Sequence, residues 1–226
     1  MELLRELLDR REIELTLRVI LNRKLPNDLI NVIIDLNSEE LYQPAPVNFQ
    51  SDIEALIKHL GYSATSGGVL FLNAIIIALI IDLAPKFIVM TRQSHNKTIT
   101  AREVQNIFYI LLKGEFRNMA LSHARQVITL WNSNLAECDR KKRQRYPKVT
   151  KLTTSKVERI IRLETKRDMR VGAGTSIYLA AVLDFILSKL LDSASKGVDE
   201  KITTECLIRG YKNNVDLKKL FHELVI

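Results

Sequence analysis

Cysteine and histidine are scarce in this 226-residue chain, and their placement excludes several kinds of site. The two cysteines, Cys138 and Cys206, lie far apart without metal-ligand spacing, so we expect neither a disulfide framework nor a metal site. This usage suits a reducing compartment. Since no glycine-rich phosphate loop is present either, we expect no cofactor and no enzymatic activity. The four histidines share no spacing typical of a catalytic site: His59, His95, His123 and His222.

Proline and glycine are also few, with five and eight residues, and the alternation typical of strands is missing. With 46% hydrophobic and 27% charged residues, the chain can bury a core. We therefore predict an all-α protein.

An apolar run of 13 residues from Val69 contains Asn73 and is followed by Asp82 and Pro85. We interpret it as too short to cross a bilayer, which predicts a buried core helix and no membrane partner.

Positive charge is unevenly spread. A net charge of +8 and a pI near 9.5 favour an acidic partner, with nucleic acid as the first candidate. Residues 1–45 hold nine acids and six bases, so this region, in which we expect helices broken at Pro26, is no basic arm. Residues 140–170 hold thirteen lysines or arginines against three acids, a net charge of +10. This basic stretch, part of which we interpret as an extended linker, is the expected binding surface. The alternative interpretation is a solvated face without a binding role.

The order short helix, long helix, short helix is predicted twice. In the first copy the long helix spans about 68–92, and a capping box from Thr100 to Glu103 starts the next helix, which Gly114 ends. The second copy covers 154–163, 175–195 and 203–212. The loops before the third helices match, with "KTITAREV" in one copy and "EKITTECL" in the other. Two units that cannot bury their long helices alone should pair with each other.

The second long helix is apolar almost all round, which predicts contacts on several sides. It begins in "RVGAGTSIYLAAVLDF", where Arg170 precedes two glycines and Thr175 is a candidate cap. Its polar line contains Asp184, Ser188, Asp192 and Ser195.

These stretches resemble core histones. "RVGAGTSIYLAAVLDFILSKLLDSA" and "NNVDLKKLFHELVI" resemble histone 2A, and "KTITAREVQNIFYILLKGEFRNMALSHARQVITLWNS" resembles histone 2B. The likeness covers about 49–226, and its order resembles the fused histone doublets of giant DNA viruses. It implies two tandem histone folds forming an intramolecular histone-fold pseudo-dimer, with an N-terminal helical extension. The implied regions are the extension 1–48, a histone 2B-like fold with a C-terminal helix 49–134, a basic linker 135–150 and a histone 2A-like fold 151–226.

The resemblance also implies a DNA-binding arc formed by paired loops and paired first-helix ends. Arg170 matches a loop arginine that enters the minor groove, Lys156 matches a groove-facing arginine, and Lys201 replaces an arginine. Both lysines keep the charge but lose the planar guanidinium, which favours shallow phosphate contact. The other expected contacts are Arg159, Arg162, Lys166, Arg167, Lys97, Thr98, Thr203, Arg140, Lys141, Lys142, Arg143 and Arg145.

The chain departs from the family pattern in several places. Asn96 replaces an arginine, so the histone 2B-like half should hold DNA less firmly. The sequence stops at Ile226, where the family continues into a segment that docks on histones 3 and 4. We hypothesise that residues 1–45 do this docking instead. The family's acidic patch keeps Asp184, Asp192 and Asp216 but has Lys189, Asn214 and Val215 in place of acids.

The function expected from the resemblance is non-sequence-specific packaging of double-stranded DNA. The implied partners are a histone 3/4-type doublet or tetramer and a second copy of the chain in an octamer-like particle. The implied location is the virion and viral factory, with the host nucleus or cytoplasm during infection. The alternative is a histone-fold transcription or replication factor that binds DNA without forming nucleosomes.

Overall fold

The chain divides into two units, Met1–Gln43 and Pro44–Ile226. The computed structural model describes residues 47–137, 148–165, 169–196 and 201–224, all in the second unit. The helices expected in residues 1–45 therefore lie outside the described residues.

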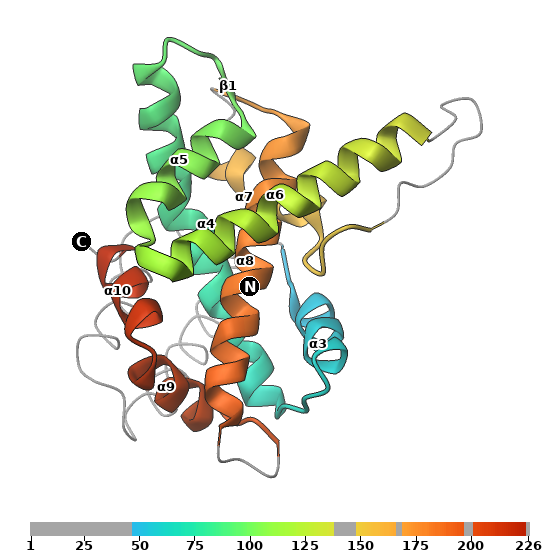
Figure 1. The fold of residues 1–226 in the computed structure, drawn as a ribbon, viewed down its shortest axis with the longest axis vertical. Helices are drawn as coiled ribbons and strands as arrows, with labels where there is room; N and C mark the ends of the chain where they lie inside the picture. Colours follow the sequence, from blue (N-terminus) through green and yellow to red (C-terminus); the bar gives the residue numbers. More distant parts are fainter. Residues whose placement is uncertain (1–46, 138–147, 166–168, 197–200, 225–226) are drawn as a thin grey trace, which may run out of the picture. The chain divides into compact units, whose positions relative to one another are not determined.

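The described residues are mostly helical and contain one two-stranded parallel pair (Figure 1). The short–long–short order occurs in both halves, and each third helix is followed by a further helix. The elements in chain order are α3 (Gln50–His59), α4 (Ser66–Gln93), β1 (Thr98–Ile99), α5 (Ala101–Leu111), α6 (Gly114–Glu137), α7 (Thr154–Glu164), β2 (Arg170–Val171), α8 (Ala173–Ser195), α9 (Thr204–Asn213) and α10 (Val215–Leu224).

Local capping fixes where α5 begins, and it confirms the predicted capping box. The Thr100 side chain accepts a hydrogen bond from the first turn, and the Thr100 N–H donates to Glu103 Oε2 at 2.8 Å. The predicted end of this helix is wrong, because α5 ends at Leu111 and Gly114 is the first residue of α6. Gly114 has φ +56°, a left-handed conformation that favours glycine, so it redirects the chain between the two helices.

Helix α8 is enclosed on several sides, as its composition predicts. It contacts α3, α5, α6, α7 and α9, and α6 lies across it (Figure 1). Thr175 is fully buried but does not cap the helix, contrary to expectation. Its hydroxyl donates to the carbonyl oxygen of Ile99 at 2.7 Å, which ties the start of α8 to the strand that precedes α5.

The two halves contact each other reciprocally through their loops. Strand β1 pairs with β2 in parallel, with Thr98 opposite Arg170, and Ala64 bridges Ile202 in parallel. The end of α4 therefore lies beside the start of α8, and the start of α4 lies beside the end of α8, so the long helices run in opposite directions. Each long helix also contacts short helices of the other half: α4 contacts α7 and α9, and α8 contacts α3 and α5.

The apolar run from Val69 is predicted from the sequence to be too short to cross a membrane, and this predicted length is wrong. Helix α4 has 28 residues and continues through Pro85; α4 and α8 are both long and apolar enough to cross a membrane. Half of the apolar window of α4 and 78% of that of α8 are buried inside the structure. Leu72, Ile76 and Ile80 of α4 are among the least exposed side chains, so the helix contributes to the core.

Candidate nucleic-acid interface

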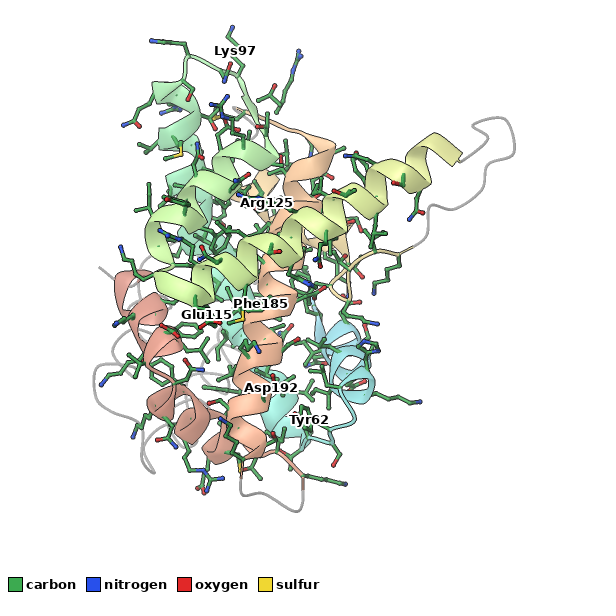
Figure 2. All side chains as sticks on the ribbon, in the orientation of Figure 1. Tyr62, Lys97, Glu115, Arg125, Phe185 and Asp192 are labelled. Atoms are coloured by element: carbon green, nitrogen blue, oxygen red, sulfur yellow. The ribbon has the colours of Figure 1, made fainter. Side chains whose placement is uncertain are left out.

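The first paired loop brings basic residues of both halves together. The N–H of Arg170 donates to the carbonyl oxygen of Lys97 at 3.0 Å, and Arg170 lies opposite Thr98 in the strand pair. Arg170 and Lys97 are exposed, and Thr98 is partly exposed (Lys97 is labelled in Figure 2). The backbone pairing thus brings Lys97, Thr98 and Arg170 close together at one end of the long helices. Their predicted contact with phosphate stays a prediction.

The second paired loop is built in the same way from the opposite ends of the long helices. The Ile202 N–H donates to the carbonyl oxygen of Ser63 at 2.8 Å, and the Thr65 N–H donates to that of Ile202 at 3.0 Å. Lys201 is exposed beside this bridge. The Thr203 hydroxyl accepts a hydrogen bond from the Cys206 N–H at 3.3 Å and so caps α9. Thr203 is also one of the predicted DNA contacts.

A third basic cluster lies where α3 and α7 begin, around the buried carboxylate of Asp52. Oδ1 accepts hydrogen bonds from Lys148 Nζ at 3.2 Å and Thr153 Oγ1 at 2.8 Å. Oδ2 accepts from Lys156 Nζ at 3.0 Å and the Thr153 N–H at 3.3 Å. Burial raises the pKa of Asp52, but the hydrogen bonds from Thr153, Lys156 and Lys148 outweigh it and hold the pKa below its usual value. Asp52 is therefore ionised at neutral pH.

This cluster changes the expected role of Lys156. Its Nζ donates to Asp52 and also to the carbonyl oxygen of Asn48 at 2.6 Å, and it lies 5.6 Å from the centre of the Phe49 ring. The predicted phosphate contact of Lys156 stays a prediction, but its ammonium group is already engaged within the chain. Asp52 and Lys148 were missed because Asp52 lies 104 residues from Lys156, and no local pattern connects them.

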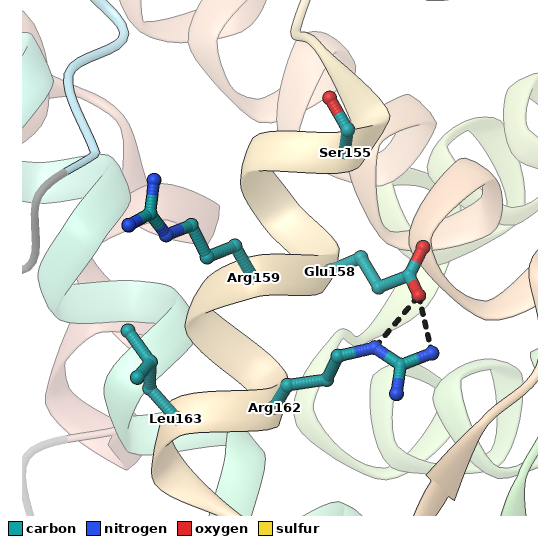
Figure 3. Close-up of a pocket in the computed structure, with 5 residues that line it drawn as sticks. All are labelled: Ser155, Glu158, Arg159, Arg162 and Leu163. Atoms are coloured by element: carbon teal, nitrogen blue, oxygen red, sulfur yellow. Dashed lines mark hydrogen bonds and ion pairs between the residues drawn. The ribbon is translucent and has the colours of Figure 1, made fainter.

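Helix α7 carries the remaining predicted contacts that lie among the described residues, Arg159 and Arg162. Arg162 forms an ion pair with Glu158, with Nη2 2.6 Å from Oε1, whereas Arg159 extends away from that pair (Figure 3). These three side chains, with Ser155 and Leu163, line a shallow depression on the helix surface. The charge of Arg159 is therefore exposed, whereas the charge of Arg162 is paired with that of Glu158. The other predicted contacts lie outside the described residues: Lys166, Arg167, Arg140, Lys141, Lys142, Arg143 and Arg145.

The three predicted acidic-patch residues have different environments. Asp184 is buried, and its carboxylate accepts the backbone N–H groups of Lys151 at 2.6 Å and Leu152 at 3.0 Å, so its assignment to an exposed patch is wrong. Asp192 accepts a hydrogen bond from Tyr62 Oη at 3.1 Å and has Lys189 Nζ at 3.8 Å (Tyr62 and Asp192 are labelled in Figure 2). Asp216 is exposed on α10. The sequence could not indicate that backbone N–H groups cover Asp184.

The donors in these three clusters suit an anion. Ammonium, guanidinium, hydroxyl and backbone N–H groups are the groups that contact nucleic-acid phosphates. Within the described residues, no three His, Cys, Asp or Glu side chains are close enough together to hold a metal ion. Comparison with protein-family models and with curated proteins gives no match for the chain.

Proposed function

We propose that this chain is a DNA-packaging protein, the fused histone 2B–2A dimer unit of a viral nucleosome-like particle. The observation that carries the proposal is the reciprocal pairing of loops, which puts Lys97 beside Arg170 and Lys201 beside the Ser63–Thr65 loop. Two tandem histone folds clasped head to tail would pair their loops in this way. The sequence resemblance to histones 2B and 2A supports the same assignment.

The proposed contacts are to the DNA backbone and its minor groove. Arg170 is the residue proposed to enter the groove, because it is exposed at the edge of the strand pair. Lys97, Lys201 and Arg159 would neutralise phosphates, and Lys156 would contribute less because Asp52 holds it. Binding of this kind reads DNA shape and deformability, and it weakens steeply as salt rises.

Assembly into a particle requires a protein partner, which we propose to be a histone 3/4-type doublet or tetramer. An apolar groove of about 270 Å³ between α4 and α5 suits such a contact; Pro85, Val89, Met90 and Ile107 are among its lining residues. Val89 is 56% exposed at this groove. The hypothesis that residues 1–45 also dock lies outside the described residues.

Nuclease digestion of DNA assembled with this chain and a histone 3/4-type partner tests the proposal. A discrete protected fragment is expected if two copies of the chain complete an octamer-like particle, and the virion and viral factory would then be its sites of action. A smear, with protection only at low salt, would contradict a defined wrap. A base-specific footprint would instead indicate a histone-fold transcription or replication factor.

A further inference from the structure

The carboxylate of Asp52 lies among groups that would otherwise be available to a phosphate. Two ammonium groups, one hydroxyl and one backbone N–H donate to its two oxygens. The side chains of Lys148 and Lys156 are 54% and 29% exposed, so solvent and a bound polyanion can reach both, whereas the Asp52 side chain is only 8% exposed.

We propose that Asp52 is an internal counter-anion that withdraws Lys148 and Lys156 from DNA binding and so lowers the affinity of the chain for duplex DNA. This inference rests on the proposed function, because it concerns one of the three clusters of the same interface. The two lysines and Asp52 together carry a net charge of +1 instead of +2. A DNA phosphate that approaches this cluster must displace the carboxylate or share the ammonium groups with it.

Lys156 is the more strongly withdrawn of the two. An ammonium group has three donors, and Asp52 Oδ2 and the Asn48 carbonyl oxygen already accept from this one. Among ion pairs between described residues, none involves Lys97, Arg170 or Lys201. The loop pairs therefore keep their charge for the phosphate backbone, and the cluster at the start of α3 and α7 does not.

Asp52→Asn in the full-length chain tests this role, because asparagine is close in shape but cannot neutralise the lysines. Binding to a short duplex of random sequence is measured by fluorescence anisotropy over a range of salt concentrations. We expect the variant to bind several-fold more tightly at physiological salt. The slope of log K against log[salt] should steepen by about 1 to 2, since each added phosphate contact contributes about 0.9.

Asp82→Asn is the matched control, because it adds the same +1 of charge. Asp82 forms a partly exposed pair with Lys86 one turn along α4, at 2.7 Å, and is not part of the three basic clusters. We expect less than a twofold change in its DNA affinity. An equal gain in both variants would mean that net charge alone is responsible and would overturn the role of Asp52.

A second comparison avoids any folding defect of the Asp52 variant. Lys156→Gln should weaken binding less than twofold, because Asp52 and the Asn48 carbonyl oxygen already engage this ammonium group, whereas Lys97→Gln should weaken it several-fold. Equal losses in the two lysine variants would show that the lysine of the cluster is as available to DNA as Lys97. Weaker binding by a well-folded Asp52→Asn variant would show that Asp52 orients the lysines for DNA. Either result would overturn the proposal. The unmodified chain reports separately on the proposed function. If only Asp52→Asn bound DNA, that function would fail and the inference would stand; if neither bound, both would fail.

Discussion

A Cβ atom on Gly210 would lie 2.6 Å from the backbone nitrogen of Ala194, so the backbones of α8 and α9 pack directly against each other at this point. Gly210→Ala should destabilise the protein by about 1–3 kcal/mol, because the helices must separate to admit the methyl group. Thermal denaturation followed by circular dichroism would show a lowered Tm. Gly67→Ala is the control, since its Cβ would meet only Thr204 Oγ1 at 3.5 Å. We expect it to be neutral or to stabilise α4 by up to about 1 kcal/mol. Equal melting of the two variants would contradict the close helix contact.

The exposed guanidinium of Arg170 should contribute strongly to DNA affinity. Arg170→Gln removes its charge but keeps the backbone N–H that donates to Lys97, so the strand pair should persist. We expect several-fold weaker binding to duplex DNA and a salt slope shallower by about 0.9, the contribution of one phosphate contact. The DNA affinity of Arg170→Lys should lie between those of the original chain and Arg170→Gln, because lysine keeps the charge but lacks the planar guanidinium group. The control is Lys219→Gln on α10, an exposed cation outside the three clusters. A similar loss in this control would show that only net charge matters.

The start of α5 shows which features the sequence could predict. A capping box is a local pattern, because Thr100 and Glu103 satisfy each other's backbone groups within one turn. The repeated helix order and the enclosed position of α8 also follow from composition and periodicity. Thr175 shows the limit of this reasoning, because its hydroxyl donates to Ile99, 76 residues away, rather than capping its own helix.

The candidate interface was also predictable only in part, because some of its contacts join residues that are far apart in the sequence. Arg170 and Lys97 could be named from the resemblance of their loops to histone loops, and the structure places the two residues side by side. The ionic contact of Lys156 with Asp52 and the burial of Asp184 depend on contacts between distant segments. A carboxylate on a helix face gives no sequence signal that distinguishes solvent from a covering loop.

The apolar groove between α4 and α5 should be required for particle assembly. Val89→Asp places a carboxylate in the groove, and we expect it to weaken association with a histone 3/4-type partner by about tenfold or more, because the contact would bury an unpaired charge. Leu70→Asp is the matched control, since Leu70 is 52% exposed on the same helix and lies outside the groove. Sedimentation of the mixed proteins in moderate salt would separate complex from free chain. If both variants lost the partner equally, the groove would not be the contact.

The burial of Asp184 should make the stability of the protein depend on pH in an unusual direction. Burial raises its pKa to about 6, although the N–H groups of Lys151 and Leu152 and the charges of Lys148 and Lys151 act the other way. Since this value lies above the ordinary 3.8, the folded state binds a proton more tightly than the unfolded state between these two pH values. The stabilisation from Asp184 should therefore increase as pH falls from about 6 to about 4, and should be lost as pH rises through 6.

Asp184→Asn isolates this dependence, because all other titrating groups are shared by the two proteins. Asparagine keeps one acceptor oxygen but places an amide N–H₂ against a backbone N–H, so the variant should be less stable by a constant amount. In addition to this constant difference, the stability difference should depend on pH. As pH falls from about 7 to about 4, the free energy of unfolding of the original chain should rise by about 2–3 kcal/mol relative to that of the variant. Urea denaturation at a series of pH values measures both curves. Parallel curves would mean that the two backbone N–H groups fully compensate the burial of the charge. Asp184 would then hold the segment before α7 equally well in either protonation state.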